Sequence, residues 1–206
     1  MKLVLKNRFY RFVTLSRFLN ALGSAMHNLV FFVLSASMYP SSPAVNLDNI
    51  TVAIPTVFTV FVGMWSDGTR RKTTWLIVSG FSQVVLFSAI ALAVGHKTWF
   101  VFSIVCLFNI MSDVLSDYKG GLMLPMTKFN VDEEDLTEAF SFTTVIRYIC
   151  DYRGQVMVVW ILAVSGNDFS IVAMINAFSF MAATLVLFFV RGQLVYEPVE
   201  SPGRTG

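Results

Sequence analysis

The sequence predicts an all-α, polytopic membrane protein, and its composition, its apolar runs and the placement of its charges each indicate this class. Hydrophobic residues make up 55% of the 206 residues, charged residues make up 14%, and the mean hydropathy is +0.66. A soluble domain of this size carries more polar surface. The apolar residues fall in long runs with Lys and Arg gathered between them. We therefore expect a helical bundle embedded in a lipid bilayer.

Six runs are long enough to cross a bilayer, since a spanning helix needs about 20 predominantly apolar residues. They lie at 12–38, 50–66, 73–94, 98–117, 137–164 and 169–190. The first run follows basic residues, as the apolar core of a signal peptide does. However, it is longer than such a core, and Arg17, Asn20 and His27 interrupt it. We therefore expect it to be the first membrane span.

The cations between the runs predict the topology. Lys and Arg occur before the first run, in every second connection and after the last run, and segments 41–49 and 165–170 hold none. By the positive-inside rule both termini are cytoplasmic, with Lys97 as the exception. We expect residues 1–191 to form one membrane domain in the plasma membrane of a bacterial cell. We expect residues 192–206 to form a disordered cytoplasmic tail.

Two runs carry polar side chains at helical spacing. The first holds Ser16, Asn20, Ser24, His27 and Asn28, and the fourth holds Asn109, Ser112, Asp113, Ser116 and Asp117. Polar groups are costly in hydrocarbon, so each stripe faces other helices or a watery cavity. The pattern leaves two interpretations open. The stripes line a shared cavity, or they are packing faces whose polar groups bond between helices. A bond from His27 to a neighbouring Ser or Asn is likewise an alternative to a role in proton transfer.

The fifth run contains three charged residues. Arg147 and Asp151 are four positions apart and can pair along one helix face. Arg153 is rotated by about 200° from Asp151, so it needs a partner on another helix or an anionic ligand. Ionisable residues at this depth are candidates for a substrate or ion path, and a structural ion pair is the alternative.

Other function classes find little support. The two cysteines, Cys106 and Cys150, are far apart and suggest neither a metal site nor a disulfide framework, so we expect buried thiols. No metal-ligand spacing, nucleophile elbow or phosphate loop is present, which argues against an enzyme, a metal site or a cofactor. The few cations lie beside the apolar runs, which argues against nucleic-acid binding.

The segment GMWSDGTRRK, residues 63–72, joins the second and third runs. Gly63 would let two helices approach closely, and Asp67 would cap the third helix. Arg70, Arg71 and Lys72 would anchor to anionic headgroups or pair with nearby acids. The segment resembles the cytoplasmic signature between helices 2 and 3 of the major facilitator superfamily. In this sequence Gly68 stands where a basic residue is usual, and Arg70 where a second glycine is usual, so we expect a less tight turn.

A second segment, LMLPMTKFNVDEEDLTEAFSF, resembles the loop and the start of helix 5 in the drug and macrolide-efflux branch of that superfamily. The matching residues are Leu124, Pro125, Asp132, Glu133, Glu134, Leu136, Thr137 and Ala139. The resemblance covers about residues 10 to 190. It implies two inverted three-helix repeats, with helices 1 and 4 lining a central cavity and the signature turn latching a closed state.

The resemblance has two departures that bear on coupling. The fourth-helix arginine of proton-coupled members aligns with Asn109, and residues 147–154 replace the glycine-proline pattern of antiporters. Any coupling would therefore fall to Asp113 or Asp151, with His27 as a relay. The predicted substrate or ion path consists of Asn20, His27, Asn109, Asp113, Arg147, Asp151 and Arg153.

Members of the superfamily pair two six-helix halves around the cavity, and this chain holds one. The resemblance therefore implies transport, in the direction of efflux, of a small amphipathic or drug-like molecule. A second six-helix half or a second copy of the chain would complete the transporter. The alternative is a membrane module without transport activity, such as a partner, immunity or regulatory protein, or a truncated remnant.

Overall fold

The computed structural model describes residues 3, 6–38, 42–96, 98–194 and 196, with the side chains of 36–38, 42–49 and 52 excepted. Most of the predicted tail, at 195 and 197–206, lies outside the described residues. The described part is all-helical. Its elements are α2 (Arg8–Met38), α3 (Ser42–Gly68), α4 (Lys72–Ala93), α5 (Trp99–Asn130), the 3-10 turn η1 (Glu133–Asp135), α6 (Leu136–Ser165), α7 (Phe169–Phe189) and the 3-10 turn η2 (Arg191–Gln193).

The helices lie at the predicted positions, and α5 differs most from its predicted range. The sequence predicts an end near residue 117, but α5 continues to Asn130. Lys119 and the glycine pair that follows it suggest a loop, yet Lys119 is buried in the bundle. A side chain on Gly121 would collide with Ser66 of α3, so this glycine serves helix packing. Only 131–135 remains as the connection to α6.

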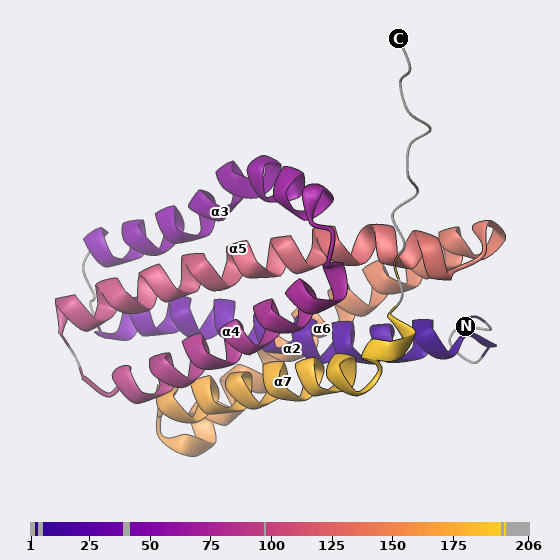
Figure 1. The fold of residues 1–206 in the computed structure, drawn as a ribbon. Helices are drawn as coiled ribbons and strands as arrows, with labels where there is room; N and C mark the ends of the chain where they lie inside the picture. The colour runs from indigo at the N-terminus through magenta and orange to yellow at the C-terminus, as the bar shows by residue number, and fades with distance from the viewer. Residues whose placement is uncertain (1–2, 4–5, 39–41, 97, 195, 197–206) are drawn as a thin grey trace, which may run out of the picture.

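Successive helices run in alternating directions, so their connections alternate between the two ends of the bundle (Figure 1). α2 packs against α6 and α7, α5 packs against α3 and α4, and α4 also packs against α7. Cross-helix hydrogen bonds fix the register: the Tyr10 hydroxyl donates to the Ala139 carbonyl over 2.8 Å, and Ser16 Oγ donates to the Ala183 carbonyl over 2.9 Å. These bonds satisfy polar groups that hydrocarbon would leave unpaired.

Four of the described helices contain stretches long and apolar enough to cross a membrane, namely Arg8–Ser35, Lys72–Ala93, Trp99–Asn130 and Phe169–Phe189. α3 and α6 are not among them, and α6 carries three charged residues in its middle. The four stretches fit an integral membrane protein, as the sequence predicts. Large apolar side chains also remain exposed on the described surface, among them Leu92 and Phe189. Such a surface suits a lipid environment.

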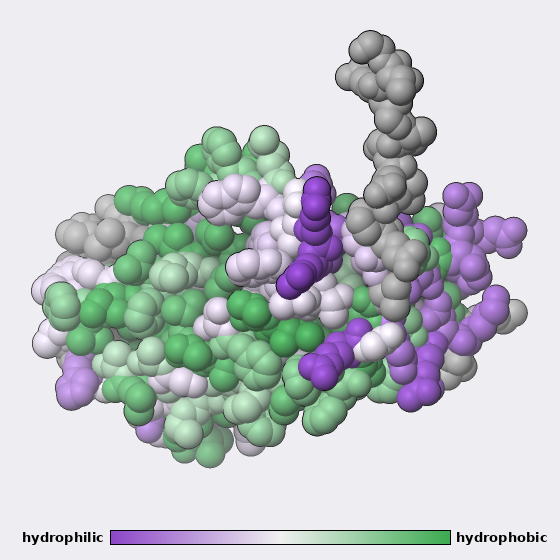
Figure 2. Space-filling view, viewed as in Figure 1, coloured by the Kyte–Doolittle hydropathy of each residue, from purple (hydrophilic) through white to green (hydrophobic). Residues whose placement is uncertain are grey.

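Charged side chains gather at one end of the bundle. Figure 2 shows the hydrophilic residues at the end that carries the N-terminus, whereas the opposite part of this face is mainly hydrophobic. The α3–α4 turn and the acidic connection before α6 also lie toward this end (Figure 1). Among the described residues, the cations that the positive-inside rule assigns to one side of the membrane therefore lie on one side of the fold, apart from Lys119.

Gly154 allows α6 to approach α2. A Cβ atom on Gly154 would lie 2.8 Å from the Ala25 Cβ atom and 3.4 Å from backbone atoms of α2. Close helix approach through small residues is a common way to pack membrane helices. Gly63, which the sequence predicts to have this function, has no atom within 4 Å of such a Cβ, so that prediction is wrong.

We predict that Gly154→Ala destabilises the bundle because the added methyl group presses against the α2 backbone. Overpacking of this kind costs about 1–3 kcal/mol. The matched control is Gly63→Ala, where space is open and the higher helix propensity of Ala predicts no loss. The measurement is thermal unfolding of the purified protein in detergent, followed by far-UV circular dichroism. Equal melting temperatures for the two variants would contradict the close contact.

Candidate functional site

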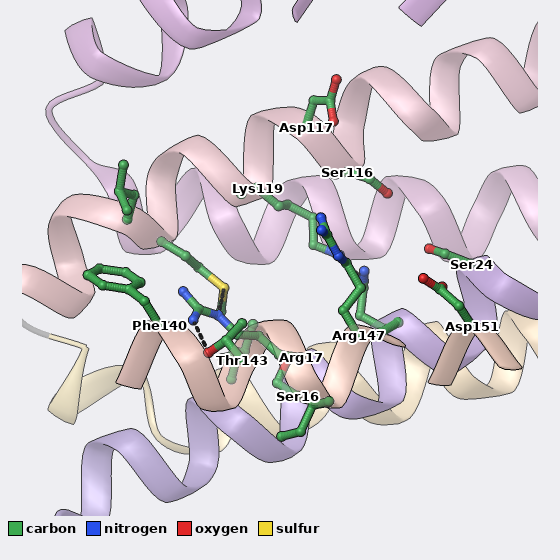
Figure 3. A pocket seen from close by; sticks show the side chains of 17 residues that line it. Ser16, Arg17, Ser24, Ser116, Asp117, Lys119, Phe140, Thr143, Arg147 and Asp151 are labelled. Atoms are coloured by element: carbon green, nitrogen blue, oxygen red, sulfur yellow. Dashed lines mark hydrogen bonds between the residues drawn. The ribbon is translucent and has the colours of Figure 1, made fainter. Parts of the chain in front are cut away.

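A cavity of about 450 Å³ lies between α2, α5 and α6. Figure 3 shows charged and hydroxyl side chains from these helices around the same space. Four exposed members of the lining, Asp117, Gly120, Leu124 and Arg147, show that the cavity reaches the surface. Its polar lining consists of Ser16, Arg17, Asn20, Ser24, Ser116, Asp117, Lys119, Thr143, Arg147 and Asp151.

Three of the seven predicted path residues, Asn20, Arg147 and Asp151, line this cavity. Arg147 and Asp151 project from the same face of α6, as their spacing predicts (Figure 3). They make no direct salt bridge, and the Arg147 guanidinium instead lies 5.6 Å from the centre of the Tyr148 ring. Arg147 is exposed and Asp151 is half-buried. The alternative of a direct ion pair along α6 is therefore not formed in the described structure, and both charges remain available to a ligand.

His27 and Asn109 meet in the core and do not line the cavity. His27 Nε2 and Asn109 Oδ1 lie 2.7 Å apart, and both side chains are buried. The imidazole packs edge-on against Phe87, with ring centres 4.6 Å apart. The structure thus matches the interpretation in which His27 bonds a neighbouring Asn across helices, which the sequence offers as an alternative to proton transfer. The pair links α2 to α5 beside the aromatic cluster that includes Phe31 and Phe180.

The other two predicted residues, Asp113 and Arg153, also lie outside the cavity lining. Asp113 is half-buried on α5, and Arg153 is exposed on α6. The sequence predicts that Arg153 needs a partner on another helix or an anionic ligand. Within the described part of the chain, it makes no ion pair or hydrogen bond.

Lys119 is the central charge of the site, and its partners are neutral. Its ammonium donates to Gln83 Oε1 over 2.6 Å and also to Asn20 Oδ1. The Gln83 amide nitrogen in turn donates to Ser116 Oγ over 2.8 Å and to the Ser112 carbonyl over 3.0 Å. Both Lys119 and Gln83 are buried. One network thus joins α2, α4 and α5 at the cavity wall.

Arg17 is a second cation held by neutral groups. Its guanidinium donates to Thr143 Oγ1 of α6 over 3.0 Å and to Thr127 Oγ1 of α5 over 3.1 Å. Its Nε–H faces the Met123 sulfur at 3.4 Å, which is a weak acceptor. Arg17 thereby bridges three helices at the end of the cavity nearer the charged end of the bundle.

The sequence signals for Arg17, Lys119 and Gln83 are weak. Arg17 interrupts an apolar run, and Lys119 follows the predicted end of the fourth span. Gln83 is a lone amide in an apolar segment, and no periodic pattern singles it out. The available signal is the high cost of placing such groups in hydrocarbon, about 3 kcal/mol for a cation at the centre of a helix. That cost would have marked Arg17 as a site residue.

The turn between α3 and α4 is organised by Lys72, which is buried, whereas the sequence predicts that it anchors to headgroups or pairs with nearby acids. Its ammonium donates to the Ser66 carbonyl over 2.7 Å and to the Asp67 carbonyl over 3.3 Å. Lys72 therefore satisfies carbonyls at the end of α3, where a positive charge is favourable. Asp67, Arg70 and Arg71 are exposed. The predicted Asp67 cap is wrong, because Arg71 is the N-cap of α4 and no side chain bonds there.

The described geometry thus defines an all-helical protein with membrane-type helices around a charged, surface-open cavity. Cys106 and Cys150 are free and buried, as the sequence predicts. No protein-family model, curated protein or solved structure matches the chain. The resemblance to the major facilitator superfamily therefore stays a prediction.

We predict that Gln83 and Lys119 are energetically coupled. Gln83→Leu removes an acceptor from a buried ammonium and costs about 1–3 kcal/mol of unfolding free energy. In a Lys119→Met background, Gln83→Leu should cost less unfolding free energy, with a coupling energy of about 0.5–3 kcal/mol. The measurement is a double-mutant cycle of unfolding in detergent. Lys128→Met, at an exposed lysine of the same helix, is the matched control, and we expect its cost and that of Gln83→Leu to add. Additive costs with Lys119→Met would contradict the coupling.

Proposed function

We propose that the chain is a transport module of the major facilitator type that moves a small amphipathic molecule across a membrane, in the direction of efflux. The observation that carries this proposal is the cavity between α2, α5 and α6, lined by charged side chains from three helices. Charged groups in membrane bundles mark substrate or ion paths more often than packing contacts. A volume of about 450 Å³ suits a small organic molecule.

The packing order supports a bundle of two inverted three-helix repeats. Exchanging α2 with α5, α3 with α6, and α4 with α7 turns the α2–α6 contact into α5–α3 and the α2–α7 contact into α5–α4. The same exchange returns the α4–α7 contact to itself. Three helices related to the next three by a twofold axis would give this pattern. In this proposal all six helices span the membrane, and α6 spans it with its charges toward the cavity.

The charged end of the bundle supports a cytoplasmic position for both termini. Arg8, Arg11, Arg70 and Arg71 lie at helix ends that alternate topology brings to one side. Trp65 and Trp75 are exposed near the same turn, and Trp99 is exposed at the opposite end of the bundle. Exposed Trp side chains at the two ends of spanning helices fit the two interfaces of a bilayer.

The open side of the cavity supports a partner bundle. Arg147 and Leu124 are exposed at its rim, and α6 exposes the neighbouring aromatic residues Tyr148 and Tyr152. A second six-helix half or a second copy of the chain would cover this side and enclose a substrate. The same exposed face also supports a second candidate function, in which the chain is a membrane partner or regulatory protein without transport activity.

Transport is tested by flux into liposomes that contain the purified chain, with matched anionic, neutral and cationic aromatic dyes. We expect flux of at least one dye, and we expect Gly120→Trp to block it, because Gly120 lines the cavity and has open space for the indole. The matched control is Gly95→Trp, which also has open space but lies at a helix end outside the cavity. Equal flux through both variants, or no flux of any dye, would contradict the proposal.

The same preparation tests the partner. Light scattering corrected for bound lipid and detergent gives the protein mass, and we expect that of two copies of the 23.1 kDa chain. A monomer that transports a dye would contradict the expectation that a second copy of the chain completes the transporter. A monomer without flux would favour the partner or regulatory function.

We predict that Asp67→Asn lowers flux at unchanged expression and unfolding temperature. Asp67 is exposed, and Lys72 bonds its backbone carbonyl, which asparagine keeps, so the fold should tolerate the change. If the carboxylate latches a closed state, its loss should reduce flux at least about fivefold, which corresponds to a coupling free energy of ~1 kcal/mol. Wild-type flux at equal protein density in the liposomes would show that the carboxylate is no latch.

A further inference from the structure

We infer that the cavity binds an amphipathic organic anion whose oxyanion group is held by Arg17, Lys119 and Arg147. The inference rests on the proposed function in one respect, since it names the substrate class of the same cavity. It follows from where the three cations lie, from what they bond, and from the rest of the lining.

The three cations come from three helices and lie within about one helical turn of one another along the bundle. Arg17 of α2 contacts Met123 of α5 and Thr143 of α6. Lys119 is four residues before Met123, and Arg147 is four residues after Thr143. Four residues correspond to roughly 6 Å along a helix. Figure 3 shows all three side chains around the same space.

None of the three cations forms a salt bridge in the described part of the chain. Lys119 bonds two amide oxygens, and Arg17 bonds two hydroxyls and a thioether. Lys119 is buried, Arg17 is half-buried and Arg147 is exposed. Buried charges in proteins are normally paired with opposite charges, yet the Lys119 ammonium bonds only neutral amides. Positive charge is therefore left without a direct counter-charge beside a cavity, which is the arrangement that an anionic ligand completes.

Two carboxylates, Asp117 and Asp151, also belong to the lining. Asp117 Oδ2 accepts a hydrogen bond from Thr59 of α3 over 2.9 Å, and Figure 3 shows its carboxylate directed away from Arg17. Asp151 lies beside Ser24, at the other end of the cavity from Arg17 (Figure 3). The end of the cavity at Arg17 is therefore farther from the Asp151 carboxylate, and an oxyanion is favoured there.

The donors suit a carboxylate or a phosphate. A guanidinium presents five N–H groups in a planar fork that matches these oxyanions, and Arg17 uses three of them in the hydrogen bonds described above. The remaining lining is apolar, so it would hold a hydrophobic body next to the charged group. Its apolar members are Ala21, Met123, Leu124, Phe140, Ile146 and Leu187.

The test is isothermal titration calorimetry of the full chain in nanodiscs with three matched probes: phenylacetate, phenylacetamide and phenethylamine. They share the aromatic body and differ in the charge of the polar group. We expect phenylacetate to bind at least about tenfold more tightly than the other two. Equal or tighter binding of the amide or the amine, or no binding of phenylacetate up to about 10 mM, would overturn the inference.

A variant pair assigns the binding to the named cations. Arg147→Gln should weaken phenylacetate binding at least about tenfold and leave the fold intact, because Arg147 is exposed. Lys128→Gln removes an exposed cation outside the cavity and should leave the affinity unchanged. Unchanged affinity in Arg147→Gln, or equal losses in the two variants, would overturn the assignment.

Nanodiscs of two compositions separate a soluble anion from a lipid headgroup. Phenylacetate should bind equally in discs of phosphatidylcholine and in discs that also contain phosphatidylglycerol. Loss of binding in the second disc would show that an anionic lipid occupies the site and would overturn the substrate assignment. The binding assay needs no flux, so the two proposals can fail separately. Flux of only neutral or cationic dyes, without phenylacetate binding, would support the transport proposal and overturn the inference of an anionic substrate.

Discussion

The buried ammonium of Lys119 is the constraint around which the bundle is arranged. A cation at this depth requires oxygen acceptors, and it finds them in the amides of Asn20 and Gln83. These two residues come from α2 and α4, so solvation of one charge ties three helices together. Gln83 extends the network back to Ser112 and Ser116 on α5. Lys119 also lines the cavity, so one side chain contributes both to helix packing and to the candidate site.

Much of the fold follows from the sequence because bilayer thickness sets the length of a spanning helix, and charge and turn residues mark its ends. The bounds of α4 and α7 lie within a residue of their predicted ranges. α5 is the exception, since Lys119, Gly120 and Pro125 suggest a loop but lie inside a helix. These residues stay helical because α2 and α4 supply acceptors for the Lys119 ammonium and α3 packs closely against the neighbouring Gly121. A single sequence segment does not contain these partners.

The site is less predictable than the fold, because residue spacing defines a helix face and does not show what that face meets. The polar stripe of α2 is split accordingly: Asn20 and Ser24 reach the cavity, whereas His27 bonds Asn109 in the core. Arg147 and Asp151 share a face as predicted but project into open space rather than toward each other. Whether two such groups pair or bind a ligand depends on the neighbouring helices, which sequence spacing does not place.

The Lys119 network has a consequence for how the chain enters a membrane during synthesis. Asn20 and Gln83 precede Lys119 in the sequence, so both acceptors exist when the lysine leaves the ribosome. The α4–α5 hairpin can insert with its ammonium already bonded to Gln83. Arg17 is made early, but its partners Thr127 and Thr143 follow more than a hundred residues later. The guanidinium of the first helix therefore gains these two acceptors only after α5 and α6 have been made.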